Sequence, residues 1–276
     1  MITALLAVLR DQSMSNHHHT VIEAIMNIFK TQGLKCVMFL PQVLGIARQA
    51  HSIIYLMCGS QIIPAFAAVA RTSAARLQEF HLQQLAILVG IIKQHIRNYT
   101  PDVFGLVTDL WENISLQLPI VSLIEALGKA LDAEFKPFLP TILPHLLKVF
   151  EGELTDKRMN TQIKIFDSFL TFGSNIEEYL HLVIPVIVKT AERPDASSIL
   201  RKRAIQTIAH LSQRVNFSDH ASRIIHPLAR VLDSPNNELR QAVMDTLCAI
   251  VIQLGSDFAV FVPMVNKVCL HHRCSS

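Results

Sequence analysis

The chain has 276 residues, of which 50% are hydrophobic and 17% charged, and its formal net charge at pH 7 is +3. So small a positive charge gives no reason to expect binding to nucleic acid or to an acidic membrane surface, and no unbroken apolar run reaches the ~18 residues that a membrane-spanning helix needs. Only 9 residues are glycine and Asn-Gly turn dipeptides are absent, which favours an all-helical chain.

The N-terminal segment, residues 1–44, shows helical periodicity. Apolar residues three and four positions apart predict helices at Ile2–Arg10 and Thr20–Lys30, and a further one begins at Leu34. The run His17-His18-His19 falls in the polar stretch between the first two helices, where we expect a solvated turn. Residues 45–61 then lose the pattern, and we interpret them as an irregular insertion.

From residue 62 to residue 268 the pattern continues as pairs of helices. The predicted helices are Pro64–Val69, Ser73–Ile96, Pro101–Glu112, Ile114–Leu131, Pro137–Phe150, Asp156–Phe172, Ile176–Ala191, Ser197–Val215, Ser222–Leu232, Asn237–Leu254 and Phe258–Val268. Pro119 indicates either a kink or a late start of its helix. Residues 269–276 carry no helical signal, and we predict that they form an unstructured tail.

The clearest pair lies at residues 221–255, with a proline in its first helix and a polar turn between the two helices. Pro235 cannot continue the first helix, and Asn236 or Asn237 can cap the second. Each helix has one apolar face, so the pair needs neighbouring pairs against which to bury it. Asp233 in the turn and Arg240 early in the second helix are expected to form a hydrogen bond that holds the repeats together.

Proline recurs in the first helix of successive pairs, at Pro64, Pro101, Pro144, Pro185, Pro227 and Pro263. A period near forty residues built from two helices is typical of HEAT and armadillo arrays. The sequence therefore predicts an all-α solenoid of the HEAT/armadillo type with about six to seven helical pairs. Residues 1–44 and 62–268 would belong to one continuous array, truncated at both ends.

Longer blocks of sequence carry a sharper resemblance. They are LRDQSMSNHHHTVIEAI (Leu9–Ile25), GLKCVMFLPQV (Gly33–Val43), EFKPFLPTILPHLLKVF (Glu134–Phe150), YLHLVIPVIVK (Tyr179–Lys189), ASRIIHP (Ala221–Pro227) and FVPMVNKV (Phe261–Val268). In this order they resemble the N-terminal HEAT solenoid of the target-of-rapamycin (TOR) serine/threonine kinases. The chain departs from that family at residues 45–61 and after Val268, which suggests a fragment or an aberrant gene model.

Catalysis by the chain itself is not expected. A protein kinase needs a glycine-rich loop, a phosphate-binding lysine, a catalytic aspartate and a metal-binding aspartate, and the sequence has no G-x-G-x-x-G, H-R-D or D-F-G string. The resemblance implies a non-catalytic scaffold within a cytoplasmic kinase complex that can act at endomembranes, with Raptor and a second TOR chain as protein partners. The alternative is a free-standing HEAT adaptor of the phosphatase-scaffold or nuclear-import-receptor type. We expect no cofactor, metal, small-molecule substrate, nucleic acid or membrane insertion.

Other side chains are candidates for sites or for the core. Four potential zinc ligands, Cys269, His271, His272 and Cys274, are crowded into the predicted tail without a second half, so a metal centre is not expected. Cys248, Phe104 and Trp111 are predicted to be core residues. Arg201, Lys202 and Arg203 cluster at a helix start, where positive charge is unfavourable. A partner carboxylate, a solvated face or the arginine ladder of HEAT repeats would explain them.

Overall fold

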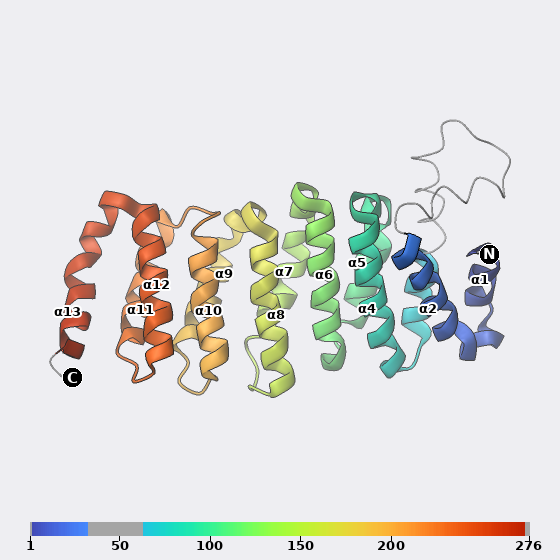
Figure 1. Cartoon of the computed structure of the whole chain (residues 1–276), viewed down its shortest axis with the longest axis horizontal. Coiled ribbons are helices and arrows are strands. Elements are labelled where there is room, and N and C mark those ends of the chain that lie inside the picture. Colours follow the sequence, from blue (N-terminus) through green and yellow to red (C-terminus); the bar gives the residue numbers. More distant parts are fainter. Residues whose placement is uncertain (1, 33–62, 274–276) are drawn as a thin grey trace. The chain divides into compact units, whose positions relative to one another are not determined.

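A computed structural model of the chain describes residues 2–32 and 63–273. Within these ranges the chain is helical and contains no strand, which confirms the predicted all-α solenoid class (Figure 1). The chain divides into two compact units, Met1–Glu134 and Phe135–Ser276. The predicted insertion at residues 45–61 lies outside the described residues, as does the helix predicted to begin at Leu34.

The first unit is built from α-helices joined by short 3-10 helices, and its longest helices pack side by side. Helix α4 contacts both α2 and α6, and the contact buries leucines such as Leu85 and Leu123. The elements are α1 (Ile2–Arg10), η1 (Gln12–Met14), α2 (Ser15–Gln32), a helix at residues 63–72, α4 (Ala75–Ile92), η4 (Lys93–Tyr99), α5 (Thr100–Leu110), η5 (Ile114–Leu116) and α6 (Gln117–Leu131). A further 3-10 helix, η6 (Asp132–Phe138), follows α6.

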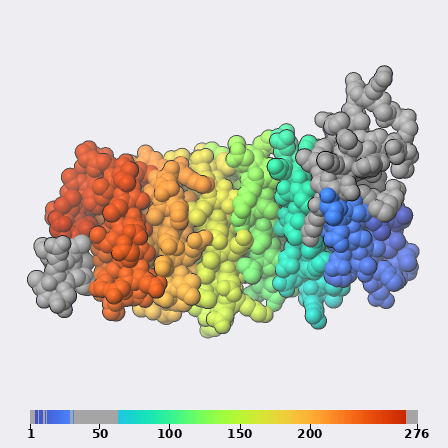
Figure 2. All heavy atoms as spheres, viewed as in Figure 1, coloured from blue at the N-terminus to red at the C-terminus, as the bar shows by residue number. Residues whose placement is uncertain are grey.

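The second unit has two rows of helices. Its elements are α7 (Leu139–Lys148), α8 (Asp156–Phe172), η7 (Gly173–Tyr179), α9 (Leu180–Glu192), α10 (Ser198–Leu211), η8 (Ser218–His220), α11 (Ala221–Leu232), α12 (Asn237–Leu254), η9 (Gly255–Phe261) and α13 (Val262–Arg273). Helix α10 contacts α8, α9 and α12, while α11 contacts α9, α12 and α13. The surface of this unit accordingly changes colour in sequence order (Figure 2), because each pair of helices packs on the pairs next to it in the chain.

Side-chain caps explain where several helices begin. Thr155 caps α8, Ser197 caps α10 and Asn236 caps α12, each accepting a hydrogen bond from a backbone N–H of the first turn. Of the two asparagines considered from sequence, Asn236 is therefore the cap. Pro119 lies in the first turn of α6, so it accompanies a late helix start rather than a kink.

The joints between one helical pair and the next share a conformation. In four of them a seven-residue 3-10 helix begins at a residue with a positive φ: Lys93 (φ 51°), Asp132 (49°), Gly173 (55°) and Gly255 (55°). Three positions later each turn buries an isoleucine or phenylalanine: Ile96, Phe135, Ile176 and Phe258. Six positions later stands a tyrosine or phenylalanine. This second repeat signal escaped the sequence analysis, which relied on proline.

Gly173→Ala is expected to lower the free energy of unfolding by about 1–2 kcal/mol, because an L-residue is strained at this φ. No atom lies within 4 Å of the added Cβ, so crowding is not the cause. Lys93→Gly should raise the free energy of unfolding by about 0.5–1 kcal/mol by relieving the same strain. The measurement is urea unfolding followed by circular dichroism. Lys93→Ala keeps the strained Cβ and should give no gain; a gain equal to that of Lys93→Gly would contradict the backbone explanation.

The predicted turn around the three histidines is wrong. Helix α2 begins at Ser15 and includes all three. His18 is buried, and its Nε2 lies 3.0 Å from the carbonyl oxygen of Val8 and 3.1 Å from that of Asp11. A polar side chain such as His18 can thus be buried when it forms hydrogen bonds with backbone carbonyls at the end of the preceding helix. A hydropathy pattern does not reveal such hydrogen bonds.

Three other predictions are corrected. Helix α13 continues to Arg273, so residues 269–273 are not an unstructured tail; no glycine or proline ends the helix earlier. Cys248 is exposed rather than in the core, because it is rotated by about 100° from the buried Leu247. Trp111 is buried as predicted, whereas Phe104 is only half-buried.

Candidate functional site

Ion pairs join residues that lie one repeat apart in the sequence. In the first unit they are Arg71–Asp109 and Arg97–Glu134, and in the second Lys136–Glu178, Asp167–Arg203, Glu192–Arg230 and Lys202–Glu238. The paired residues are 36–42 positions apart. The ion pairs therefore follow the period of the array and link neighbouring pairs of helices.

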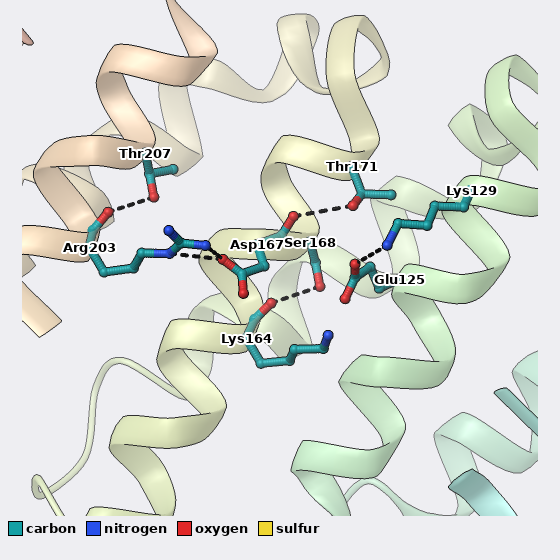
Figure 3. A network of polar contacts seen from close by, with 8 residues as sticks. All are labelled: Glu125, Lys129, Lys164, Asp167, Ser168, Thr171, Arg203 and Thr207. Carbon is teal, nitrogen blue, oxygen red and sulfur yellow. Dashed lines mark hydrogen bonds and ion pairs between the residues drawn. The ribbon is translucent and has the colours of Figure 1, made fainter. Parts of the chain in front are cut away.

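The basic cluster at the start of α10 contacts three different helices. The Arg203 guanidinium pairs with Asp167 on α8, the Lys202 ammonium lies 3.1 Å from a carboxylate oxygen of Glu238 on α12, and the Arg201 Nε donates to the carbonyl of Ala191 on α9 at 2.8 Å. Figure 3 shows the first contact, with the two side chains pointing toward each other from α10 and α8. Consecutive helical residues point about 100° apart, so three neighbours in the sequence reach three directions.

This geometry favours one of the three explanations for the cluster. The sequence left open a partner carboxylate, a solvated face or the arginine ladder of HEAT repeats, and Lys202 and Arg203 contact carboxylates on neighbouring repeats of the same chain, as a ladder does. The cluster therefore holds α10 in the stack. Two of its three positive charges are paired with carboxylates of the same chain.

An alanine double-mutant cycle at Asp167 and Arg203 is expected to give a coupling energy of about 0.5–1 kcal/mol in urea unfolding. The estimate is modest because the side chains are 30% and 33% exposed. The matched control is the cycle at Lys136 and Glu178, which are 46% and 65% exposed and should therefore couple more weakly. Equal coupling energies at the two ion pairs would contradict the assumption that burial determines how strongly an ion pair stabilises the fold.

The joint after α10 differs from the four positive-φ joints, and Gln253 holds it from the next repeat. The Gln253 amide accepts a hydrogen bond from the Phe217 N–H at 3.1 Å. It donates to the carbonyls of Ser212 and Val215, at 2.5 and 2.6 Å. A side chain one repeat away thus supplies the polar partners that the regular turn supplies elsewhere.

The structure places the prolines predicted from the repeat in first helices. Pro144, Pro185 and Pro227 lie inside α7, α9 and α11, and Pro101 lies in the first turn of α5. Pro64 lies in the helix at residues 63–72 and Pro263 in α13. Asp233 follows the last residue of α11, while the Arg240 guanidinium donates to the Asn237 side chain. The Asp233–Arg240 hydrogen bond stays a prediction.

A groove of about 720 Å³ lies between the first helices α9 and α11 of the second unit. Its apolar lining comes from both helices and includes Pro185 and Pro227, the equivalent prolines of two successive repeats. Charged and polar side chains complete it: Lys189, Glu192 and Arg193 from the α9 side, and Ser222, Arg223, His226 and Arg230 from α11. No sequence motif predicted this groove, because it needs two helices 42 residues apart, the separation of Pro185 and Pro227.

Two of the four permanent cations around the groove are already paired. The Glu192 carboxylate lies 2.6 Å from the Arg230 Nε and raises the pKa of Arg230 above its usual value. Asp195 likewise pairs with Arg193, raising the pKa of the guanidinium and lowering that of the carboxyl. Lys189 and Arg223 are exposed, and within the described part of the chain neither forms an ion pair. The groove therefore presents two available cations above an apolar floor.

Within the described ranges, no group of three or more His, Cys, Asp or Glu side chains is placed to hold a metal ion. By length and composition, two helical stretches there are apolar enough to cross a membrane: Ile114–Lys148, with 61% of its window buried, and Asn237–Lys267, with 17% buried. Neither stretch is an unbroken apolar run, because both contain polar residues. The first stretch packs mainly inside the protein, and core helices of soluble proteins often meet the same criterion.

Comparison with known families and proteins agrees with the fold. A family model described as serine/threonine-protein kinase mTOR domain matches residues 1–54 and 46–93, and one described as stalled ribosome sensor GCN1-like, HEAT repeats, matches residues 119–269. The chain is 46% identical to serine/threonine-protein kinase tor1 of Schizosaccharomyces pombe, over 99% of this chain and 11% of that protein. It is 38% identical to TOR2 of Saccharomyces cerevisiae and to mTor of Drosophila melanogaster, each over 99% of this chain and 10% of the relative.

Solved structures show the same architecture at low identity. The crystal structure of Kap121p matches 95% of this chain and 24% of its own, with a TM-score of 0.65 and 14% identity. A designed armadillo repeat protein matches 91% of this chain and 100% of its own, with a TM-score of 0.58 and 13% identity. These two likenesses concern the fold alone. From its repeats, its fold and its relatives, the chain belongs to the HEAT-repeat family and matches the N-terminal HEAT region of the TOR kinases.

Proposed function

We propose that the chain is a non-catalytic scaffold segment of a TOR-like serine/threonine kinase that acts in nutrient and growth signalling. The observation that carries the proposal is the 46% identity to a TOR kinase across 99% of this chain. The chain spans only about a tenth of that relative and of the next two, 10–11% of their length. Phosphoryl transfer would then belong to another part of such a kinase, and this segment would contribute binding surface.

Solenoids of this kind bind other proteins through many small contacts spread over adjacent repeats. By resemblance to the TOR family, we propose the Raptor subunit and a second kinase chain as the partners, and the cytoplasm as the location. The repeat-to-repeat ion pairs support this role, because they keep successive helical pairs in register and so give a partner a fixed surface. A free-standing adaptor gains no support from the likeness to import receptors, since a 14% identity indicates only a shared fold.

The test is a binding titration, measured by biolayer interferometry. The purified chain is titrated against a purified Raptor-type subunit and, separately, against intact TOR kinase. We expect binding to at least one of them. We also expect no transfer of labelled phosphate from ATP to a kinase substrate by the chain alone. Phosphate transfer by the chain would refute the non-catalytic assignment. Failure to bind either protein would refute the proposed partners.

A further inference from the structure

We propose that the groove between α9 and α11 is a docking site for a short extended segment of a partner protein, in which two acidic residues flank apolar ones. The proposal deepens the scaffold function and rests on it for the class of ligand, a protein. Three features of the groove support this ligand: the direction of its two helices, its apolar floor, and the two cations that form no ion pair within the described residues.

The two helices that wall the groove run in the same direction. The ion pair between Glu192 and Arg230 joins the C-terminal ends of α9 and α11. The groove lining covers Ser222 to Arg230 on α11, which at ~1.5 Å per residue is a length of about 12 Å. An extended peptide advances ~3.3 Å per residue, so about four residues fit along the groove.

The floor of the groove is apolar, and its aliphatic side chains are largely buried within the protein itself. Ile184 is 1% exposed and Val188 is 7% exposed, while Pro185 and Pro227 lie beside them. Each proline lacks the backbone N–H that would continue its helix ladder and disturbs the preceding turn. Prolines at equivalent positions of α9 and α11 therefore explain why the two helices leave a groove between them beside Pro185 and Pro227. Apolar side chains of a ligand can fill it.

The available cations lie toward opposite ends of the groove. Arg223 is in the first turn of α11, whereas Lys189 is in the last turn of α9, beside the Glu192–Arg230 pair. Measured along the axes of the parallel helices, the two positions are about 10 Å apart, the distance from Arg223 to the level of Arg230 at ~1.5 Å per residue. In an extended peptide, residues three positions apart are also about 10 Å apart. The fitting pattern is acidic–apolar–apolar–acidic.

Other classes of ligand fit less well. Nucleic acid is bound through many phosphate contacts, whereas this groove has two unpaired cations. Anionic membranes attract clusters of four to eight lysines and arginines at an exposed surface, and here two of the four cations are neutralised by Glu192 and Asp195. Two cations above an apolar floor favour a peptide that carries both carboxylates and hydrocarbon.

The experiment is a fluorescence anisotropy titration of the whole chain with a fluorescein-labelled peptide Gly-Ser-Asp-Leu-Leu-Glu-Ser-Gly. The comparison peptide replaces Asp by Asn and Glu by Gln. The test variant combines Lys189→Glu with Arg223→Glu. The matched control combines Lys148→Glu with Lys157→Glu, which makes the same charge change at exposed lysines of the same unit outside the groove. Circular dichroism melting verifies that both variants are folded.

We expect the acidic peptide to bind, the neutral peptide to bind about tenfold more weakly, and the groove variant to lose about tenfold in affinity while the control variant keeps it. Equal losses in both variants would indicate general charge attraction and overturn the proposal, as would absence of binding. Phosphatidylserine vesicles or a single-stranded oligonucleotide that bind with the same dependence on Lys189 and Arg223, in place of the peptide, would also overturn it. If the groove variant still binds the Raptor-type subunit or the intact kinase, the scaffold function survives the failure of this site.

Discussion

Phe135→Ala is expected to lower the free energy of unfolding of the unit Phe135–Ser276 by about 3–5 kcal/mol. The Phe135 side chain is 0% exposed. Its ring stacks on that of Phe172 with centroids 5.0 Å apart, and it lies 6.4 Å from the ring of Phe138. Removing the ring leaves a cavity at the joint where the unit begins, and the surrounding helices can close it only in part.

Urea unfolding followed by far-ultraviolet circular dichroism measures this loss. The matched control is Phe138→Ala, which removes the same group from the same turn at a half-buried position and should cost about 1–2 kcal/mol, in proportion to the smaller area withdrawn from water. Similar losses at the two positions would show that the turn is less tightly packed than its burial indicates.

Lowering the pH from neutral to 4 is expected to cost the protein about 3 kcal/mol of stability through His81 alone. Burial of the His81 ring, followed by the charges of His19 and His18, lowers its pKa from 6.5 to about 4. The side chain is 1% exposed, and neither ring nitrogen has a hydrogen-bond partner within the described residues. Below pH 6.5 His81 binds a proton in the unfolded chain but not in the folded chain. The free energy of unfolding therefore falls steadily until pH 4.

His81→Leu should remove this dependence. The difference in unfolding free energy between the variant and the parent chain should grow in favour of the variant between pH 6.5 and pH 4 and then level off. Replacing an unpaired buried polar ring by an apolar group should not destabilise the chain at neutral pH. The control is His210→Leu, which makes the same change of side chain at an exposed position. A constant difference for His81→Leu would mean that His81 binds its proton as readily in the folded chain as in the unfolded chain.

The periodicity of the sequence predicted most helices of the fold, since amphipathic spacing and capping residues are local. The bounds of α8 and α12 agree with the predicted ranges, because Thr155 and Asn236 cap them and the joints after Phe172 and Leu254 begin with glycine. The equivalent joints at Lys93 and Asp132 could not be predicted, since lysine rarely adopts a positive φ and a single aspartate is only a weak signal of one.

The candidate site was less predictable than the fold. The cluster Arg201–Arg203 was visible in the sequence, but its acceptors were not, because they depend on which helix faces which residue one repeat away. The groove combines residues of α9 and α11, and each helix alone carries only an unremarkable amphipathic pattern. A site formed by two repeats requires the register between them, which hydropathy does not encode.

The one-repeat spacing of the ion pairs also has a consequence for how the chain folds. Because these described contacts join residues only 36–42 positions apart, little chain entropy is lost in forming each one. Folding can then start at any helical pair and spread to the next. On a ribosome that adds ~5–20 residues per second, a new pair of about forty residues would emerge roughly every 2–8 seconds. Each pair could dock on the one before it. During synthesis, only the helical pair made last would then have an apolar face exposed to solvent.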